Sequence, residues 1–127
     1  MKIVYNFIIY AYILAIRISS LYNKKARLWI EGRKNIFYKL KEQLKGGKDI
    51  VWFHCASLGE FEQAKPVIEA YKLKYEDHKI LLTFFSPSGF EIQKSNPIVD
   101  WVFYLPNDTK LNAKKFISIT KPIKAIF

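Results

Sequence analysis

The chain has 127 residues with a formal net charge of +10, and 50% of its residues are hydrophobic. This length and composition allow one domain with a sizeable core and exclude an intrinsically disordered chain. The single cysteine excludes an internal disulfide and a metal site built from several cysteines, and it is compatible with a reducing compartment.

The chain begins with an apolar segment that predicts a membrane anchor. Residues 3–21 read IVYNFIIYAYILAIRISSL, and their longest clean apolar run, Phe7 to Ile16, is ten residues long. Because a helix needs about 20 apolar residues to cross a bilayer, we expect residues 1–22 to form a marginal span or an interfacial helix. Four tyrosines suit the membrane interface: Tyr5, Tyr10, Tyr12 and Tyr22. A signal peptide and a buried core helix are the alternatives, although no Ala-x-Ala-like site precedes the basic NKKAR stretch.

The next segment, residues 23–48, is predicted to be a basic linker with one short helix over residues 35–44. Residues 1–48 hold 11 Lys or Arg against 2 acids, whereas residues 49–127 hold 10 against 9. A basic flank beside an apolar helix favours attraction to anionic lipid, about 1 kcal/mol per charge, and nucleic-acid binding is the competing interpretation. If the first helix spans the membrane, five charges keep the following domain in the cytoplasm: Lys24, Lys25, Arg27, Arg33 and Lys34.

Residues 49–127 alternate between strand and helix patterns. Ile50 to Cys55 is uncharged and rich in β-branched and aromatic residues, as in a strand buried on both faces of a parallel sheet. Further strands are expected at 79–85, 100–105 and 123–127. Three helices are expected between them: one at 60–76, a short one after the turn at 86–89, and one that begins after Asn107 or Asp108 and ends at about residue 120. This order predicts an α/β fold with a parallel, right-handed, Rossmann-like sheet. A last strand without a covering helix suggests an N-terminal piece of a larger protein.

Small residues follow the first two strands, where the turns should present groups to a ligand. Ser57 and Glu60 form a capping-box pattern, in which each side chain accepts a hydrogen bond from a free N–H at the helix start. Ligands of open α/β sheets bind outside the carboxyl ends of the strands, so Glu60 lies where a ligand would bind, although it can equally serve only to complete the capping box. The candidate substrate-binding residues are Ser57, Gly59, Ser86, Ser88 and Gly89. Helix capping explains the serines about equally well, and Asn107 or Asp108 is expected to cap the third helix.

Four motifs carry a family resemblance: KARLWIEGRKN, HCASLGE, LLTFFSPSG and FYLPND, in this order. Together they resemble the N-terminal domain of the transferases of 3-deoxy-D-manno-octulosonic acid (Kdo), membrane-associated enzymes of lipopolysaccharide biosynthesis. The resemblance implies half of a GT-B glycosyltransferase, with Glu60 as the base that accepts the proton of the attacking hydroxyl. It further implies the donor CMP-Kdo, held by a second domain, the acceptor lipid IV-A and the cytoplasmic face of the inner membrane, with no metal needed. By itself the 127-residue piece is expected to be inactive, since donor and acceptor must be held together.

Other functions are less well supported by the sequence. His54 and Cys55 are neighbours in a strand and point to opposite faces, which argues against a Cys/His dyad and leaves His54 as a core histidine near the site edge. No cluster has metal-ligand spacing, and the G-x-G-x-x-G fingerprint of dinucleotide cofactors is absent. The remaining alternatives are a non-enzymatic, membrane-tethered α/β module that binds a phosphorylated ligand or partner, and a basic nucleic-acid-binding domain.

Overall fold

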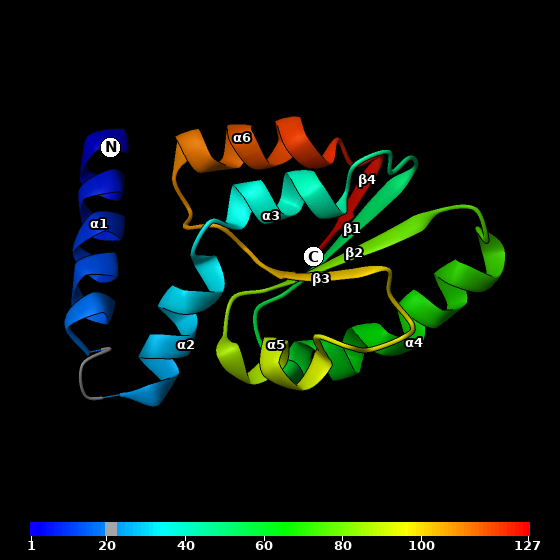
Figure 1. Cartoon of the computed structure of the whole chain (residues 1–127), viewed down its shortest axis with the longest axis horizontal. Coiled ribbons are helices and arrows are strands. Elements are labelled where there is room, and N and C mark those ends of the chain that lie inside the picture. Colours follow the sequence, from blue (N-terminus) through cyan, green and yellow to red (C-terminus); the bar gives the residue numbers. More distant parts are fainter. Residues whose placement is uncertain (20–22) are drawn as a thin grey trace.

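The computed structural model describes residues 1–19 and 23–127, in which helices and strands alternate from β1 onward (Figure 1). The helices are α1 Lys2–Ser19, α2 Lys24–Arg33, α3 Ile36–Gln43, α4 Leu58–Lys74, α5 Pro87–Gln93 and α6 Lys110–Thr120. The strands are β1 Ile50–Cys55, β2 Lys79–Phe84, β3 Trp101–Tyr104 and β4 Lys124–Ile126. The first strand has its predicted bounds, and the other three are shorter than predicted by one or two residues.

The strands form one parallel sheet. Within the described residues it has four strands in the order β3-β2-β1-β4, and each neighbouring pair runs parallel. Val51 of β1 pairs with Ile80 of β2 on one side and with Lys124 of β4 on the other. The predicted α/β, Rossmann-like sheet is therefore confirmed. Because the chain moves from β1 to β3 and then returns to the opposite side, its direction across the sheet reverses between β1 and β4.

Helices cover both faces of the sheet, with α3 and α6 on one side and α4 and α5 on the other (Figure 1). Val51, Phe53 and Cys55 of β1 pack with Phe61 and Ile68 of α4 on one face. On the other face the core consists of alternate strand residues and of side chains from α3 and α6: Ile50, Trp52, Leu81, Phe103, Ile36, Leu40, Leu44 and Phe116. Burial on both faces explains why β1 is an uninterrupted apolar run.

The sequence analysis did not predict α2. The Asn23 side chain accepts a hydrogen bond from the Lys25 N–H at 2.9 Å and so caps the helix. Trp29 of α2 is buried, and α3 supplies the buried Ile36 and Leu40. The segment between residues 23 and 48 therefore contributes buried side chains to the folded core, which its deletion would open.

The start of α6 corrects a prediction. Thr109 is the N-cap in place of Asn107 or Asp108, and its Oγ1 accepts a hydrogen bond from the Asn112 N–H at 3.2 Å. Asp108 accepts a hydrogen bond from the Tyr5 hydroxyl instead. The prediction was wrong because three consecutive residues all have capping side chains, and only the backbone decides which of them lies at the helix start.

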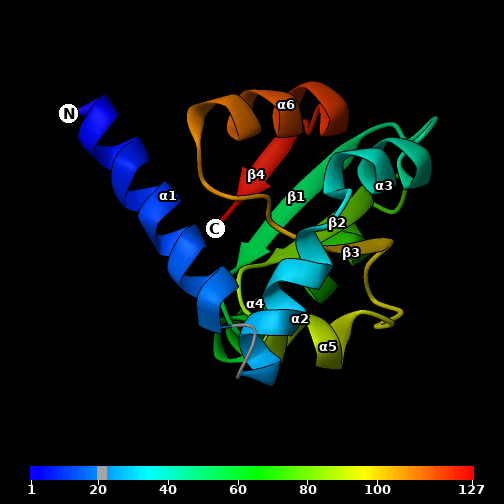
Figure 2. The same cartoon turned by 60° about the vertical axis from the view of Figure 1, so that its left-hand side comes forward.

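The first helix lies at the edge of the molecule beside α2 (Figure 2). None of its residues is buried, although Tyr12 packs against Trp29 and Phe85 with ring centroids 6.4 and 6.5 Å apart. With 18 residues and a mean hydropathy of 1.4, α1 is long and apolar enough to cross a membrane, which is weak evidence of membrane association because signal sequences share these properties. Tyr22, which was expected at the membrane interface, lies outside the described residues.

Candidate functional site

The carboxyl ends of β1 and β4 border an open cavity of about 560 Å³, here called the Glu60 pocket. His54 and Cys55 line it from β1, Ile126 lines it from β4, and Glu60 and Gln63 line it from the first turns of α4. This is the point at which the chain reverses its direction across the sheet. Such a point is where open α/β sheets bind their ligands.

Glu60 is exposed at the rim of this pocket, and one of its oxygens is held in place. Oε2 accepts a hydrogen bond from the Ala56 N–H at 2.5 Å, while Oε1 has no hydrogen-bond partner among the described residues. The carboxylate lies in the first turn of α4, at the positive end of the helix dipole. The arrangement thus presents a free, oriented carboxylate oxygen to the pocket.

The predicted capping box forms only in part. Ser57 is the N-cap of α4, but its side chain makes no capping hydrogen bond, and Glu60 bonds the N–H of the residue before the cap. Ser57 and Gly59 therefore flank Glu60 in the turn, and the hydroxyl of Ser57 is not occupied by the helix.

The second predicted turn lies next to the first. The Ser86 N–H donates to the Ala56 carbonyl at 2.9 Å, which ties the start of α5 to the turn before α4. The hydroxyls of Ser86 and Ser88 are 2.8 Å apart and bond one another, and Ser86 makes no side-chain cap. Both turns therefore meet at the carboxyl edge of the sheet, although Ser86 and Ser88 do not line the Glu60 pocket itself.

The two glycines of these turns differ in their surroundings. Gly89 is buried, and a Cβ placed there would lie 2.3 Å from Cδ1 of Phe84. Gly59 is exposed, and a Cβ there would meet only the Ser57 Oγ at 3.8 Å. Packing against the sheet thus accounts for Gly89, whereas nothing in the described fold requires a glycine at position 59.

His54 lines the Glu60 pocket and takes part in a chain of hydrogen bonds beneath it. The Trp52 Nε1–H donates to the Thr83 Oγ1 at 2.8 Å, and the His54 Nδ1 lies 2.8 Å from the same oxygen. Because Thr83 is fully buried, its hydroxyl proton needs an acceptor, and Nδ1 is the one at hand. Burial lowers the pKa of His54, so the ring is neutral and carries its proton on Nε2.

Cys55 is buried beside the same pocket. Burial, together with the charge of Glu60, raises the pKa of its thiol to about 11. The thiol stays protonated near neutral pH, so it is a poor nucleophile. Of the two neighbours in β1, only His54 presents a usable polar group to the pocket.

A second cavity of about 490 Å³, here called the α1 groove, runs between α1 and the carboxyl edge of the sheet. Its wall is mostly apolar and aromatic: Ile8, Ile9, Tyr12, Ile13, Trp29 and Phe85. It shares His54 and Ala56 with the Glu60 pocket, so the two cavities adjoin. The sequence analysis missed this groove, because it depends on the packing of α1 against distant turns.

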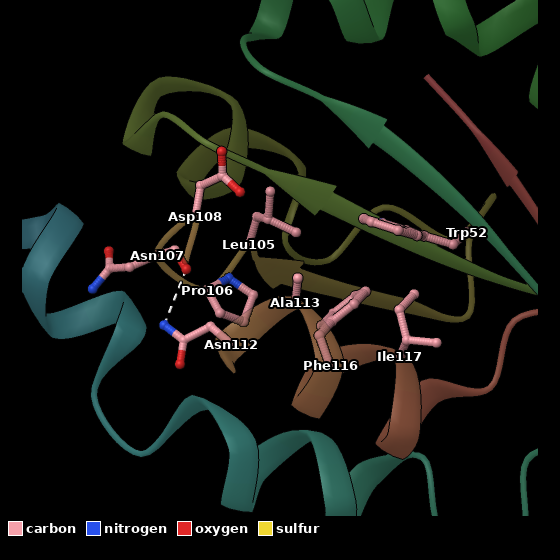
Figure 3. A pocket seen from close by; sticks show the side chains of 9 residues that line it. All are labelled: Trp52, Leu105, Pro106, Asn107, Asp108, Asn112, Ala113, Phe116 and Ile117. Atoms are coloured by element: carbon pink, nitrogen blue, oxygen red, sulfur yellow. Dashed lines mark hydrogen bonds between the residues drawn. The ribbon is translucent and has the colours of Figure 1, made fainter. Parts of the chain in front are cut away.

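A smaller cavity of about 160 Å³ lies between α6 and the sheet (Figure 3). Trp52, Phe116 and Ile117 line it on one side and Pro106 and Asn107 on the other (Figure 3). Its lining is largely apolar, and no cluster of three or more potential metal ligands occurs in the described part of the chain.

The family model described as 3-deoxy-D-manno-octulosonic-acid transferase (kdotransferase) matches residues 27–127. A 3-deoxy-D-manno-octulosonic acid transferase of Aquifex aeolicus is 39% identical over 83 residues, which are 65% of this chain and 23% of the relative. The protein of the same name from Chlamydia muridarum is 30% identical over 89 residues, 68% of this chain and 21% of the relative. No solved structure matches the chain.

A plant protein extends this set. The probable mitochondrial 3-deoxy-D-manno-octulosonic acid transferase of Arabidopsis thaliana is 36% identical over 74 residues, 58% of this chain and 17% of the relative. The chain therefore spans about a fifth of the length of the curated relatives it matches, with shares of 23%, 21% and 17%.

Proposed function

Because the chain belongs to the 3-deoxy-D-manno-octulosonic-acid transferase family, we propose that it takes part in glycosyl transfer from CMP-Kdo to lipid IV-A. The observation that carries this proposal is the exposed Glu60 carboxylate at the reversal point of the sheet, with one oxygen bonded and the other free. The predicted base is thus neither sealed in the core nor turned to the opposite edge.

In the proposed reaction Glu60 acts as general base. A hydroxyl of the acceptor approaches Oε1, and its oxygen attacks the anomeric carbon of the donor sugar while its proton passes to the carboxylate. The bond from that carbon to CMP breaks, CMP leaves with the bonding electrons, and the configuration at the carbon is inverted. The Ala56 N–H holds Oε2, so the carboxylate keeps its orientation while the proton moves.

The neighbouring residues have supporting roles in this proposal. The unbonded Ser57 hydroxyl and the open backbone at Gly59 allow a sugar to approach beside Glu60. The Ser86 and Ser88 hydroxyls, together with the turn closed by Gly89, form the outer wall of the acceptor site. The His54 Nε2–H is directed by the Thr83 contact and can donate to an acceptor oxygen.

The proposed placement in the cell is supported by the apolar helix α1 and by the basic residues that come after it. We propose that α1 holds the domain at the cytoplasmic face of the inner membrane and that the acceptor enters along the α1 groove. The chain spans only about a fifth of its curated relatives, 23% of the Aquifex protein, and the donor site is proposed to correspond to a part of these relatives that the chain does not match.

The test is transfer of Kdo by the full-length protein with Glu60→Gln. A general base contributes about 10²–10⁴-fold to the rate, so the variant should lose at least about 100-fold in turnover with unchanged folding. Glu62→Gln, an exposed acid two residues further along α4 that does not line the pocket, is the matched control and should keep its activity. Near-normal turnover of Glu60→Gln would remove this residue from the mechanism. Ligand binding without transfer in any form of the protein would favour the non-enzymatic module instead.

A further inference from the structure

Arg33, the last residue of α2, lies at the carboxyl edge of the sheet with an unusual set of partners. Its Nε donates to the Leu105 carbonyl at 2.8 Å, one terminal nitrogen to the Phe85 carbonyl at 2.9 Å and the other to the Trp29 carbonyl at 3.2 Å. The guanidinium carbon lies 3.9 Å from the centroid of the Trp29 ring and 4.9 Å from that of Tyr104. These contacts use three of the five N–H groups of the guanidinium and leave two free.

Among the described residues the charge of Arg33 has no counterion. In the described part of the chain no carboxylate lies within ion-pair distance of it, and burial lowers the pKa of its guanidinium to about 10. Carbonyl dipoles and aromatic faces stabilise the cation but leave its net charge uncompensated. A partly buried cation with free donors and no acid is a binding determinant for an anion.

A cavity of about 340 Å³, here called the Arg33 pocket, opens next to this charge. Besides Arg33 its polar lining consists of Asn35, Asn107, Asn112 and Lys115 together with Tyr38, and none of its lining residues, all of them described, is an Asp or Glu. The Lys115 ammonium lies 4.6 Å above the Phe37 ring, which fixes a second positive charge at the rim. Asp108 belongs to other cavities and is bonded to Tyr5.

Unsatisfied polar atoms gather around the same residue. The described chain has three buried side-chain atoms without a hydrogen-bond partner: Trp29 Nε1, the Tyr104 hydroxyl and Asn107 Oδ1. Trp29 and Tyr104 hold their rings against Arg33, and Asn107 shares its pocket. Figure 3 shows the Asn107 side chain directed away from Asp108, toward the ribbon of α2 and α3. Of these residues only Asn107 lines the Arg33 pocket, so its Oδ1 is the buried atom whose hydrogen bonding a polar ligand in that pocket would complete.

The Arg33 pocket is connected to the proposed reaction site. Arg33 and Asn107 also line the α1 groove, and the groove adjoins the Glu60 pocket through His54 and Ala56. The carboxyl edge of the sheet thus has a carboxylate at one end, an apolar groove in the middle and a cationic, amide-lined pocket at the other end. A phosphorylated, acylated sugar has the matching sequence of groups.

We propose that the Arg33 pocket binds a phosphate group of the lipid-linked sugar acceptor. The free N–H groups of Arg33 and the ammonium of Lys115 donate to the phosphate oxygens, and a neighbouring sugar hydroxyl donates to Asn107 Oδ1. The assignment rests on the proposed transfer to a lipid acceptor, and it adds a determinant that selects acceptors carrying a phosphate at a distance from the reacting hydroxyl.

The test is binding of the full-length protein, without donor, to neutral vesicles that carry one defined probe lipid at a time, measured by calorimetry. The probes are lipid IV-A, the same disaccharide lipid with its phosphates removed, and phosphatidylglycerol. The native protein should bind lipid IV-A at least about tenfold more tightly than the dephosphorylated lipid, the factor expected from one charge-assisted hydrogen bond. Lys115→Glu should abolish this difference. Lys114→Glu, an equal change of charge at the neighbouring exposed lysine outside the pocket, should preserve it.

Three results would overturn the assignment. The first is equal affinity of the native protein for the two disaccharide lipids. The second is an equal effect of Lys115→Glu and Lys114→Glu on the difference in affinity. The third is a loss of affinity in Lys115→Glu that is confined to phosphatidylglycerol vesicles, which would assign the charge of Lys115 to binding membrane headgroups. Because no donor is present, these results are independent of catalysis. If the native protein transfers no Kdo but still binds the phosphorylated lipid more tightly than the dephosphorylated one, the proposed transfer reaction would be refuted and the phosphate assignment would stand. Arg33→Gln, checked by circular dichroism, should repeat the loss if it remains folded.

Discussion

Alanine at the two glycines of the predicted acceptor turns should have opposite effects on stability. Gly89 and Gly59 both lie in the first turn of a helix at the same edge of the sheet, yet only Gly89 is packed against a side chain. Comparing Gly89→Ala with Gly59→Ala therefore separates a glycine needed for packing from one that the fold does not need.

The expected magnitudes follow from the neighbouring atoms. At position 89 the new Cβ would lie 2.3 and 2.5 Å from two carbons of the Phe84 ring, and Phe84 is fully buried, so the ring cannot move out to solvent. Such overpacking costs about 1–3 kcal/mol, from which the better helix propensity of alanine subtracts about 0.5–1 kcal/mol. At position 59 the contact of 3.8 Å is an ordinary one, so only the gain of up to about 0.5–1 kcal/mol remains.

The assay is urea and thermal unfolding followed by circular dichroism. Gly89→Ala should have the lower midpoint, by about 4–8 °C for each kcal/mol in a domain of this size, and Gly59→Ala should be equal to or above the native protein. In a transfer assay Gly59→Ala should nevertheless lose activity, because its methyl group stands where the acceptor approaches the backbone beside Glu60. Native-like stability of Gly89→Ala would refute the packing argument, and full activity of Gly59→Ala would refute the close approach.

Three further changes test other parts of the molecule. Thr83→Val should destabilise the fold by about 1–3 kcal/mol in urea unfolding, because the Trp52 Nε1–H and the His54 Nδ1 lose their shared partner, while Thr83→Ser should recover most of the loss. The pKa of His54 lies below its ordinary value of 6.5 in the fold, so the unfolded chain binds more protons and stability falls as the pH drops below 6.5. His54→Gln should therefore flatten the decline of the unfolding midpoint between about pH 7 and pH 5. Deleting residues 1–19 should abolish co-flotation with anionic vesicles and lower the unfolding midpoint only slightly, because no residue of α1 is buried and Tyr12 is lost from Trp29 and Phe85.

Each of these has a clear contrary result. Equal stability of the valine and serine variants at position 83 would show that the hydroxyl is not needed by its two neighbours. An unchanged pH profile of His54→Gln would place the acid sensitivity elsewhere. Vesicle binding that survives the deletion would assign the attraction to the basic residues that follow α1, and binding of nucleic acid that survives it would revive the competing interpretation of the charge.

The sheet was predictable because burial on both faces leaves a direct trace in the sequence. Residues 50–55 contain no charge and many β-branched or aromatic side chains, and the strand has these bounds in the structure. Helix α2 left no such trace, since Trp29 is its one buried residue and its other residues are mostly charged or partly exposed. The cap of α6 also escaped prediction, because neighbouring polar residues compete for it and the backbone decides.

The candidate site was predictable only where its residues are close in sequence. Glu60 and the turn around it follow directly after one strand, so the position of the carboxylate could be inferred from the strand-to-helix order. The partners of Arg33 come from residues 29, 85 and 105, and the Arg33 pocket is closed by α6. Contacts between such distant positions depend on tertiary packing, and a local pattern does not contain them.

The three carbonyl contacts of Arg33 have a mechanical consequence. They fasten the end of α2 to the segments that follow β2 and β3, and α2 in turn carries α1. The end of α2 therefore cannot shift without moving the segments that follow β2 and β3. In the proposed reaction, the orientation of α2 at a lipid surface would therefore also set the orientation of the sheet edge that carries the Glu60 carboxylate.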